Sequence, residues 1–220
     1  FSQEGSELVT NGDFATDSDW TKQTSWSISG GAANYDFLSD AKYIRQTLLS
    51  GGFVAGKSYK INFEITSGTA YMYVSSNAAG LISLNTYSVG SYSIYVTASA
   101  SGSDLLIYGR NTSGTAFSID NVSVKEVGQD WTLGTGWSIG DGKAESNGSQ
   151  STISDIEQNI TLNQGSTYIV KFDLIRSAGT LYPKVGNTTG TGLTSTQSVS
   201  QNIVAGSSNK LELRADANFI

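Results

Sequence analysis

The sequence predicts an all-β protein built from antiparallel β-sandwiches. Short stretches rich in Val, Ile, Tyr and Phe are separated by Ser, Thr, Gly and Asn, and residues that favour helices are sparse. Several stretches alternate apolar with polar residues, which is typical of strands with one buried face. Turn-forming pairs such as Asn11-Gly12 and Asp141-Gly142 separate them. No stretch has the periodicity of an amphipathic helix.

The predicted strands follow one another along the chain. The clearest covers residues 59–65, in which Tyr59, Ile61, Phe63 and Ile65 share one face. The same alternation predicts strands over residues 92–96, 117–124 and 168–174. Many short strands of this kind, joined by glycine-rich turns, indicate a sandwich in which each strand buries one face.

The chain contains a tandem duplication. Trp20-Thr21 followed by Trp26-Ser27-Ile28 returns 111 positions later as Trp131-Thr132 followed by Trp137-Ser138-Ile139. Further matches keep the same order: residues 44–46 with 156–158, 56–59 with 165–168, 63–65 with 172–174, and 67–71 with 177–182. We therefore predict two domains, residues 1–126 and 127–220, with the four recurring tryptophans in their cores.

The second copy stops before its last strand. The first copy closes with the strand at 117–124, whereas the second reaches only Phe219-Ile220. A sandwich without this strand has an open edge and an apolar slot. Two interpretations follow: the natural chain continues beyond residue 220, or another subunit donates the strand.

The composition excludes several classes of chemistry. The chain has no Cys and no His, which excludes a thiol nucleophile, an imidazole base and a zinc finger. With 13 basic and 19 acidic residues the net charge is −6, which argues against nucleic-acid and anionic-membrane partners. Apolar runs such as residues 105–108 are too short for membrane insertion.

Paired carboxylates are the catalytic route that this composition leaves open. Glu64 and Asp173 match in the two copies, but their phase within the strands directs them to solvent. Glu157 is matched by Arg45, which a shared mechanism would not tolerate. We therefore predict that the chain is not an enzyme.

Aromatic residues give the candidate ligand site. Tyr71 and Tyr73 flank Met72 and so project from the same face of a strand, and we take Tyr182 as the repeat of Tyr71 in the second copy. Sugars bind by stacking their apolar faces on rings, with polar groups at the edges. The predicted ligand-binding residues are Tyr71, Tyr73, Tyr108, Arg110 and Tyr182. The alternative is that these tyrosines fill the sandwich cores, with their hydroxyls at the edge.

The order of several motifs resembles a known family. The opening Glu7-Leu8-Val9-Thr10-Asn11-Gly12-Asp13-Phe14, then Trp20, Trp26, Gln46, the turn at residues 56–59 and the closing strand at 117–124 resemble a carbohydrate-binding module of the family 4/9 type. The resemblance covers residues 7–126 and, more thinly, 129–220, where the Asn-Gly-Asp-Phe opening is missing. It implies a jelly roll of two facing antiparallel sheets and noncatalytic binding of polysaccharide.

The resemblance also implies a structural calcium ion in the first domain. The ion would lie between the N-terminal segment and the final strand, with Asp13 and Asp120 as ligands and backbone oxygens from Asn11 or Gly12. Ala15 stands where the pattern expects an acidic residue, which removes one ligand.

Tandem Ser/Thr-rich modules of this kind also resemble segments of bacteriophage tail, fibre and capsid-decoration proteins. We therefore expect a structural or binding module of a virion or another extracellular surface assembly. Its expected partners are neighbouring subunits and polysaccharide. One alternative is an accessory carbohydrate-binding region of a secreted polysaccharide-degrading enzyme, and another is a small carbohydrate-active enzyme.

Overall fold

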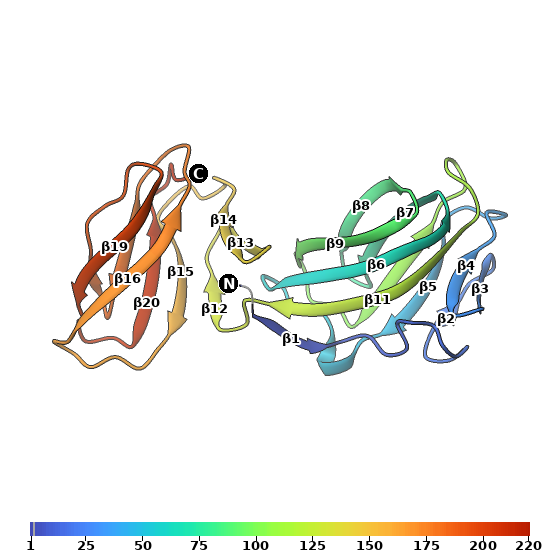
Figure 1. Cartoon of the computed structure of the whole chain (residues 1–220), viewed down its shortest axis with the longest axis horizontal. Helices are drawn as coiled ribbons and strands as arrows, with labels where there is room; N and C mark the ends of the chain where they lie inside the picture. The colour runs from blue at the N-terminus through green and yellow to red at the C-terminus, as the bar shows by residue number, and fades with distance from the viewer. Residues whose placement is uncertain (2) are drawn as a thin grey trace. The chain divides into compact units, whose positions relative to one another are not determined.

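The computed structural model describes Phe1 and residues 3–220, and this part of the chain is all-β (Figure 1). It contains twenty strands, one short 3₁₀ turn at Leu49–Gly51 and no α-helix. The predicted fold class is confirmed. The chain divides into two compact units, of which one ends at Val127 and the other contains Gly128–Ile220. None of the described segments is a helix long and apolar enough to cross a lipid bilayer.

The first unit is a sandwich of two antiparallel sheets. We call the first the β11 sheet; its order is β3-β4-β11-β6-β9, with β1 also paired to β11. Its strands are β1 (Glu4–Glu7), β3 (Trp26–Ser29), β4 (Ala32–Tyr35), β6 (Ser58–Gly68), β9 (Gly90–Thr97) and β11 (Phe117–Val127). The second, the β10 sheet, has the order β2-β5-β10-β7-β8. Its strands are β2 (Thr21–Lys22), β5 (Lys42–Thr47), β7 (Ala70–Ser76), β8 (Gly80–Tyr87) and β10 (Asp104–Gly109).

The core of this unit lies between the two sheets. On β6 the alternating residues Tyr59, Ile61, Phe63 and Ile65 are all buried, as the sequence pattern predicted. They pack in one cluster with inward residues of the β10 sheet such as Ile44, Met72 and Ile107. Each large apolar side chain buried in this way contributes about 1.5–3 kcal/mol.

The second unit repeats this plan in reduced form. One sheet has the order β12-β15-β20-β17-β18, and two hairpins, β13-β14 and β16-β19, take the place of the β11 sheet. The strands are β12 (Trp131–Leu133), β13 (Trp137–Gly140), β14 (Lys143–Ser146), β15 (Ser154–Asn159), β16 (Thr167–Leu174), β17 (Leu181–Val185), β18 (Thr188–Thr189), β19 (Gln197–Val204) and β20 (Lys210–Ala215). A counterpart of β11 is absent from the described strands, as predicted.

Individual contacts repeat along with the strands. The Tyr59 hydroxyl accepts a hydrogen bond from the backbone N–H of Val54 at 2.8 Å, and the Tyr168 hydroxyl accepts one from Asn163 at 2.8 Å. Both donors lie five residues before their tyrosine. The two copies therefore match at the level of single hydrogen bonds.

Three of the four recurring tryptophans are core residues, and the fourth is a correction. Trp20, Trp26 and Trp137 are buried, whereas Trp131 is half-buried. Trp20 packs on Phe14 and donates its indole N–H to the backbone oxygen of Asn11 at 3.0 Å. The second copy lacks the Asn-Gly-Asp-Phe opening that supplies these two contacts, so the corresponding tryptophan is less covered.

Candidate functional site

Three tyrosines stand side by side on the outer face of the β10 sheet. Tyr108 on β10 is the direct cross-strand partner of Tyr43 on β5 and of Tyr73 on β7. The rings of Tyr73 and Tyr108 are stacked, with centroids 4.4 Å apart and planes at 7°. The centroids of Tyr43 and Tyr108 are 5.2 Å apart, with planes at 66°. We call these three residues the tyrosine row.

The alternation of β7 explains why these rings face outward. Ala70, Met72 and Val74 are buried against the core, so Tyr71 and Tyr73 occupy the opposite face and are half-buried. Tyr43 and Tyr108 are outward in the same way on their own strands. The tyrosines that do fill the core are different ones, namely Tyr35, Tyr59 and Tyr87.

An ion pair lies beside the row. The Arg110 guanidinium donates through Nε to Asp40 Oδ1 at 2.7 Å, and the backbone N–H of Asn111 donates to the same oxygen at 3.0 Å. The hydrogen bond from Arg110 lowers the pKa of Asp40 below its ordinary value, and that bond also raises the pKa of Arg110. In their ionised forms Tyr73 and Tyr71 would raise the Arg110 pKa further, so the guanidinium lies within electrostatic range of both side chains.

Glycine is required next to this site. A Cβ placed on Gly109 would lie 2.8 Å from the ring of Tyr35, which is buried in the core. The backbone of β10 therefore approaches this ring closely, in the interval between Tyr108 and Arg110. We expect any larger residue at position 109 to displace both of these side chains.

The chemistry of the row suits binding. Desolvation raises the pKa of Tyr73 and Tyr108, so both phenols stay neutral and can donate as well as accept hydrogen bonds. Tyr108 lies between its two ring partners, and Tyr43 and Tyr73 are at the two ends of the row. Asp40 is held ionised by Arg110, which is the opposite of what a general acid requires.

Four of the residues predicted to bind a ligand, Tyr71, Tyr73, Tyr108 and Arg110, lie together on one face, and their role in binding stays a prediction. Tyr43 was missed, although Ile44 and Gln46 are both buried and the alternation alone directs position 43 outward. Its place beside Tyr108 depends on the register of β5 against β10, which no local pattern specifies.

Tyr182 belongs to a different setting in the second unit. It lies on β17 opposite Arg214 of β20, which binds Asp155 of β15 through two hydrogen bonds of 2.9 Å. By strand register, Asp155, Arg214 and Tyr182 occupy the places that Tyr43, Tyr108 and Tyr73 hold in the first unit. Tyr182 therefore corresponds to Tyr73 and not to Tyr71, which corrects the sequence alignment. Among the residues that the structure describes, no aromatic ring packs on Tyr182.

The residues expected to bind calcium do not make a complete site. Asp13 is exposed, and among the described residues no three acidic side chains form a metal-binding group. The backbone oxygen of Asn11 already accepts hydrogen bonds from Phe14 and Trp20, and that of Gly12 accepts one from Val122 at 2.8 Å. Calcium takes about six to eight oxygen ligands. The residues present do not fit such an ion.

The surroundings of Asp120 disfavour its ionised form. Burial raises its pKa above the ordinary value, and the charges of Glu64 and Asp13 raise it further. Ionised Asp120 is therefore unfavourable in the folded state. We expect Asp120→Asn to raise the melting temperature of the first unit at pH 7, because the amide oxygen can still accept the 2.7 Å hydrogen bond from the Asn121 N–H.

The sign of this effect depends on pH. Because the folded pKa of Asp120 is raised, the folded state loses stability as pH rises from the unfolded pKa, near 3.9, through the folded pKa, and below that range the carboxyl is neutral in both states. The gain from Asp120→Asn should therefore vanish at about pH 3. Thermal melts of both proteins across this range are the measurement. A variant that is less stable at neutral pH, as loss of a cation ligand would make it, contradicts this assignment.

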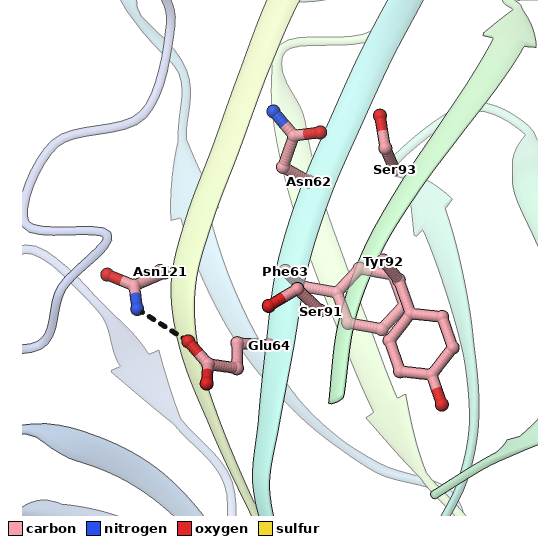
Figure 2. A pocket seen from close by; sticks show the side chains of 7 residues that line it. All are labelled: Asn62, Phe63, Glu64, Ser91, Tyr92, Ser93 and Asn121. Carbon is pink, nitrogen blue, oxygen red and sulfur yellow. Dashed lines mark hydrogen bonds between the residues drawn. The ribbon is translucent and has the colours of Figure 1, made fainter. Parts of the chain in front are cut away.

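A shallow hollow lies on the outer face of the β11 sheet. It is a shallow depression of about 240 Å³ lined by Asn62, Phe63, Glu64, Ser91, Tyr92, Ser93 and Asn121 (Figure 2). Asn121 donates from Nδ2 to Glu64 Oε2 at 2.9 Å. The rings of Phe63 and Tyr92 stack on each other with centroids 5.2 Å apart. The depression offers hydrogen-bonding groups and a single carboxylate among its lining residues, without a row of outward rings.

Comparisons with known proteins give no family assignment. No protein-family model matches the chain, and no curated protein matches it. One similar solved structure is the N-terminal CBM22-1-CBM22-2 tandem domain of Paenibacillus barcinonensis Xyn10C, at 12% identity over 98% of this chain and 90% of that one, with a TM-score of 0.38. Another is CBM35 from Paenibacillus barcinonensis, at 20% identity over 50% of this chain and 90% of that one, with a TM-score of 0.32. At these TM-scores neither likeness bears on function.

Proposed function

We propose that the first unit is a noncatalytic carbohydrate-binding module that holds a polysaccharide along the tyrosine row. The observation that carries this proposal is the alignment of Tyr43, Tyr108 and Tyr73 across three neighbouring strands, outside the core. Aromatic residues that are not needed for packing, and that are gathered on one outer face, are typical of a binding surface.

The row offers both parts of sugar recognition. Ring faces at its two ends can pack against the apolar faces of sugars, and the phenol hydroxyls can exchange hydrogen bonds with sugar hydroxyls. Arg110 and Asp40 add charged hydrogen-bonding groups beside the row. Because the row crosses three strands, it suits several consecutive sugars better than a single one.

We expect Tyr73→Ala to weaken polysaccharide binding at least tenfold, which corresponds to about 1.4 kcal/mol. This ring is at one end of the row and also supports the ring of Tyr108, on which it stacks. The measurement is a glycan array, followed by affinity titration of the best ligand. The matched control is Tyr95→Ala, because Tyr95 is half-buried on β9 in the other sheet, under Lys60. Equal binding by wild type and Tyr73→Ala would contradict the proposal.

The setting of the module is proposed more broadly. Asp40, the carboxylate beside the row, is held ionised by Arg110 and so does not act as a general acid. A face that binds polysaccharide without cleaving it agrees with an accessory carbohydrate-binding region of a polysaccharide-degrading enzyme, in which another domain is catalytic. An extracellular location agrees with a polysaccharide ligand. The virion setting and the virion subunits as partners stay predictions, which rest on the resemblance to segments of bacteriophage virion proteins. We assign the second unit as an incomplete copy without the glycan-binding row.

A further inference from the structure

Two arginines flank the tyrosine row, one on each side. Arg45 follows Tyr43 by two residues on β5. Arg110 follows Tyr108 by two residues, just beyond the end of β10. The alternation of strands places each arginine on the same face as its tyrosine. Because β5 and β10 are antiparallel and Tyr43 is opposite Tyr108, two steps along each strand lead to opposite sides of the row.

Each arginine faces an aspartate. Arg110 binds Asp40 at 2.7 Å, and Arg45 Nη1 lies 3.5 Å from Oδ2 of Asp104 on β10. The other carboxylate oxygen of Asp104 accepts a hydrogen bond from Thr47 Oγ1 at 2.9 Å. Asp104 is buried, so a nearby cation is needed to compensate its charge, and Arg45 supplies one. The two arginines and two aspartates together carry no net charge.

The balance of charge beside the row is stable near pH 7. The guanidinium of Arg110 stays protonated, and its hydrogen bond lowers the pKa of Asp40, which therefore stays ionised. The phenols of Tyr73 and Tyr108 stay neutral, because desolvation raises the pKa of both. The row and its flanks therefore present polar groups without a net charge.

Such a surface suits a ligand that has hydroxyl groups and no charge. A sugar hydroxyl both donates and accepts hydrogen bonds, and each arginine–aspartate pair offers donors and acceptors side by side. A carboxylate or sulfate on the ligand would meet Asp40 as well as Arg110, and would have to compete with Asp40 for the guanidinium. The net charge of −6 on the chain adds a repulsion of anions that is largest at low salt.

We propose that Asp40 determines the charge selectivity of the tyrosine row: it cancels the charge of Arg110, so that the row binds uncharged polysaccharides and rejects anionic ones. Asp104 has the same effect on Arg45 at the other side of the row. This inference rests on the proposed function, because it concerns which glycans the row binds. Asp40 is the better residue to test, because its side chain is 36% exposed and that of Asp104 only 10%.

The variant that tests this proposal is Asp40→Asn. Its amide oxygen can still accept the hydrogen bonds from Arg110 and from the Asn111 N–H, while Arg110 loses its counter-ion. The ligands are three pairs of polysaccharides, each with an uncharged and an anionic member: hydroxyethyl- and carboxymethyl-cellulose, highly methyl-esterified and de-esterified pectin, and agarose and sulfated carrageenan. The measured quantity is the ratio of affinities for the uncharged and the anionic member of a pair.

We expect the wild type to favour the uncharged member at about 0.01 M salt. Asp40→Asn should lower this ratio about fivefold, which is the effect of one charge pair in water. At about 1 M salt the two proteins should have similar ratios, because exposed charges are then screened. Hydrogen exchange in β5 and β10 reports that the sheet is intact in the variant. The wild-type ratio and its dependence on salt test the proposal even without the variant.

The matched control is Asp36→Asn. Asp36 is exposed in the same loop between β4 and β5, where its carboxylate accepts a hydrogen bond from the Leu38 N–H at 2.9 Å. This variant removes the same charge and should keep the wild-type ratio.

Tighter binding of the anionic members by the wild type overturns the inference and leaves the proposed function standing. An unchanged ratio in Asp40→Asn, or an equal change in Asp36→Asn, also overturns it. A wild-type protein that binds neither these polysaccharides nor any glycan on the array contradicts the proposed function itself, and the inference with it.

Discussion

Lys184→Ala is expected to destabilise the second unit by about 3–5 kcal/mol. Lys184 and Glu212 face each other across β17 and β20, with Nζ and Oε1 3.0 Å apart and side chains only 7% and 6% exposed. The other carboxylate oxygen of Glu212 is buried and accepts no hydrogen bond from the residues described. Removal of the lysine leaves a buried carboxylate whose neighbouring cations are already paired. Arg214 is 3.5 Å away and binds Asp155, and Lys210 binds Glu157.

The double variant Lys184→Met/Glu212→Met is the control for this prediction. It removes both charges and fills the same space with apolar side chains, so its stability should be close to that of the wild type or higher. Denaturant unfolding gives the free energies, and hydrogen exchange in β17 and β20 localises the change. A single variant that costs less than about 1 kcal/mol, as exposed ion pairs do, would contradict the prediction.

Phe117→Ala is expected to destabilise the first unit by about 3–5 kcal/mol. Phe117 is 2% exposed and opens β11, where its ring centroid lies 5.6 Å from that of Trp26 and 5.3 Å from that of Tyr35. Truncation removes these contacts and leaves a cavity between rigid rings, which cannot collapse fully to fill it.

Phe117→Leu is the matched control, because it keeps an apolar side chain in the same place and should cost much less. The measurement is unfolding by denaturant combined with exchange in β4 and β11. Equal losses for the Ala and Leu variants would show that ring packing does not stabilise this end of the sandwich.

Much of the fold could be predicted because its strands are amphipathic. The buried residues Tyr59, Ile61, Phe63 and Ile65 recur at every second position, and this period appears in the sequence itself. The half-burial of Trp131 could be anticipated less well. The first copy has the Asn-Gly-Asp-Phe opening, which covers Trp20, and the second copy lacks it. The conserved spacing of the tryptophans does not show this difference in their surroundings.

The candidate site depends on register, which the sequence specifies weakly. Tyr71 and Tyr73 were predictable because two positions on one strand share a face. The pairing of Tyr43 with Tyr108 joins segments more than sixty residues apart and follows from cross-strand alignment. A shift of two residues, which keeps the side chain on the same face of the sheet, also separates the predicted match of Tyr182 with Tyr71 from the observed match with Tyr73.

The two copies have kept one scaffold and changed the face it presents. In the first unit three tyrosines cross the sheet, and in the second the same places hold Asp155, Arg214 and a single tyrosine. The adjacent ion pair of Lys184 and Glu212 adds two further charged groups, buried and of opposite sign, to the same sheet. A duplicated sandwich with one aromatic face and one charged face is expected to bind glycan through the first alone.

The most direct test of this account is a residue-resolved NMR titration of the whole chain with the polysaccharide, or an oligosaccharide of it, that binds best on the array. The account predicts chemical-shift changes that centre on Tyr43, Tyr73, Tyr108 and Arg110. Changes that centre instead on the outer face of the β11 sheet around Tyr95, or on Asp155 and Arg214, would contradict it, as would the absence of binding to any glycan.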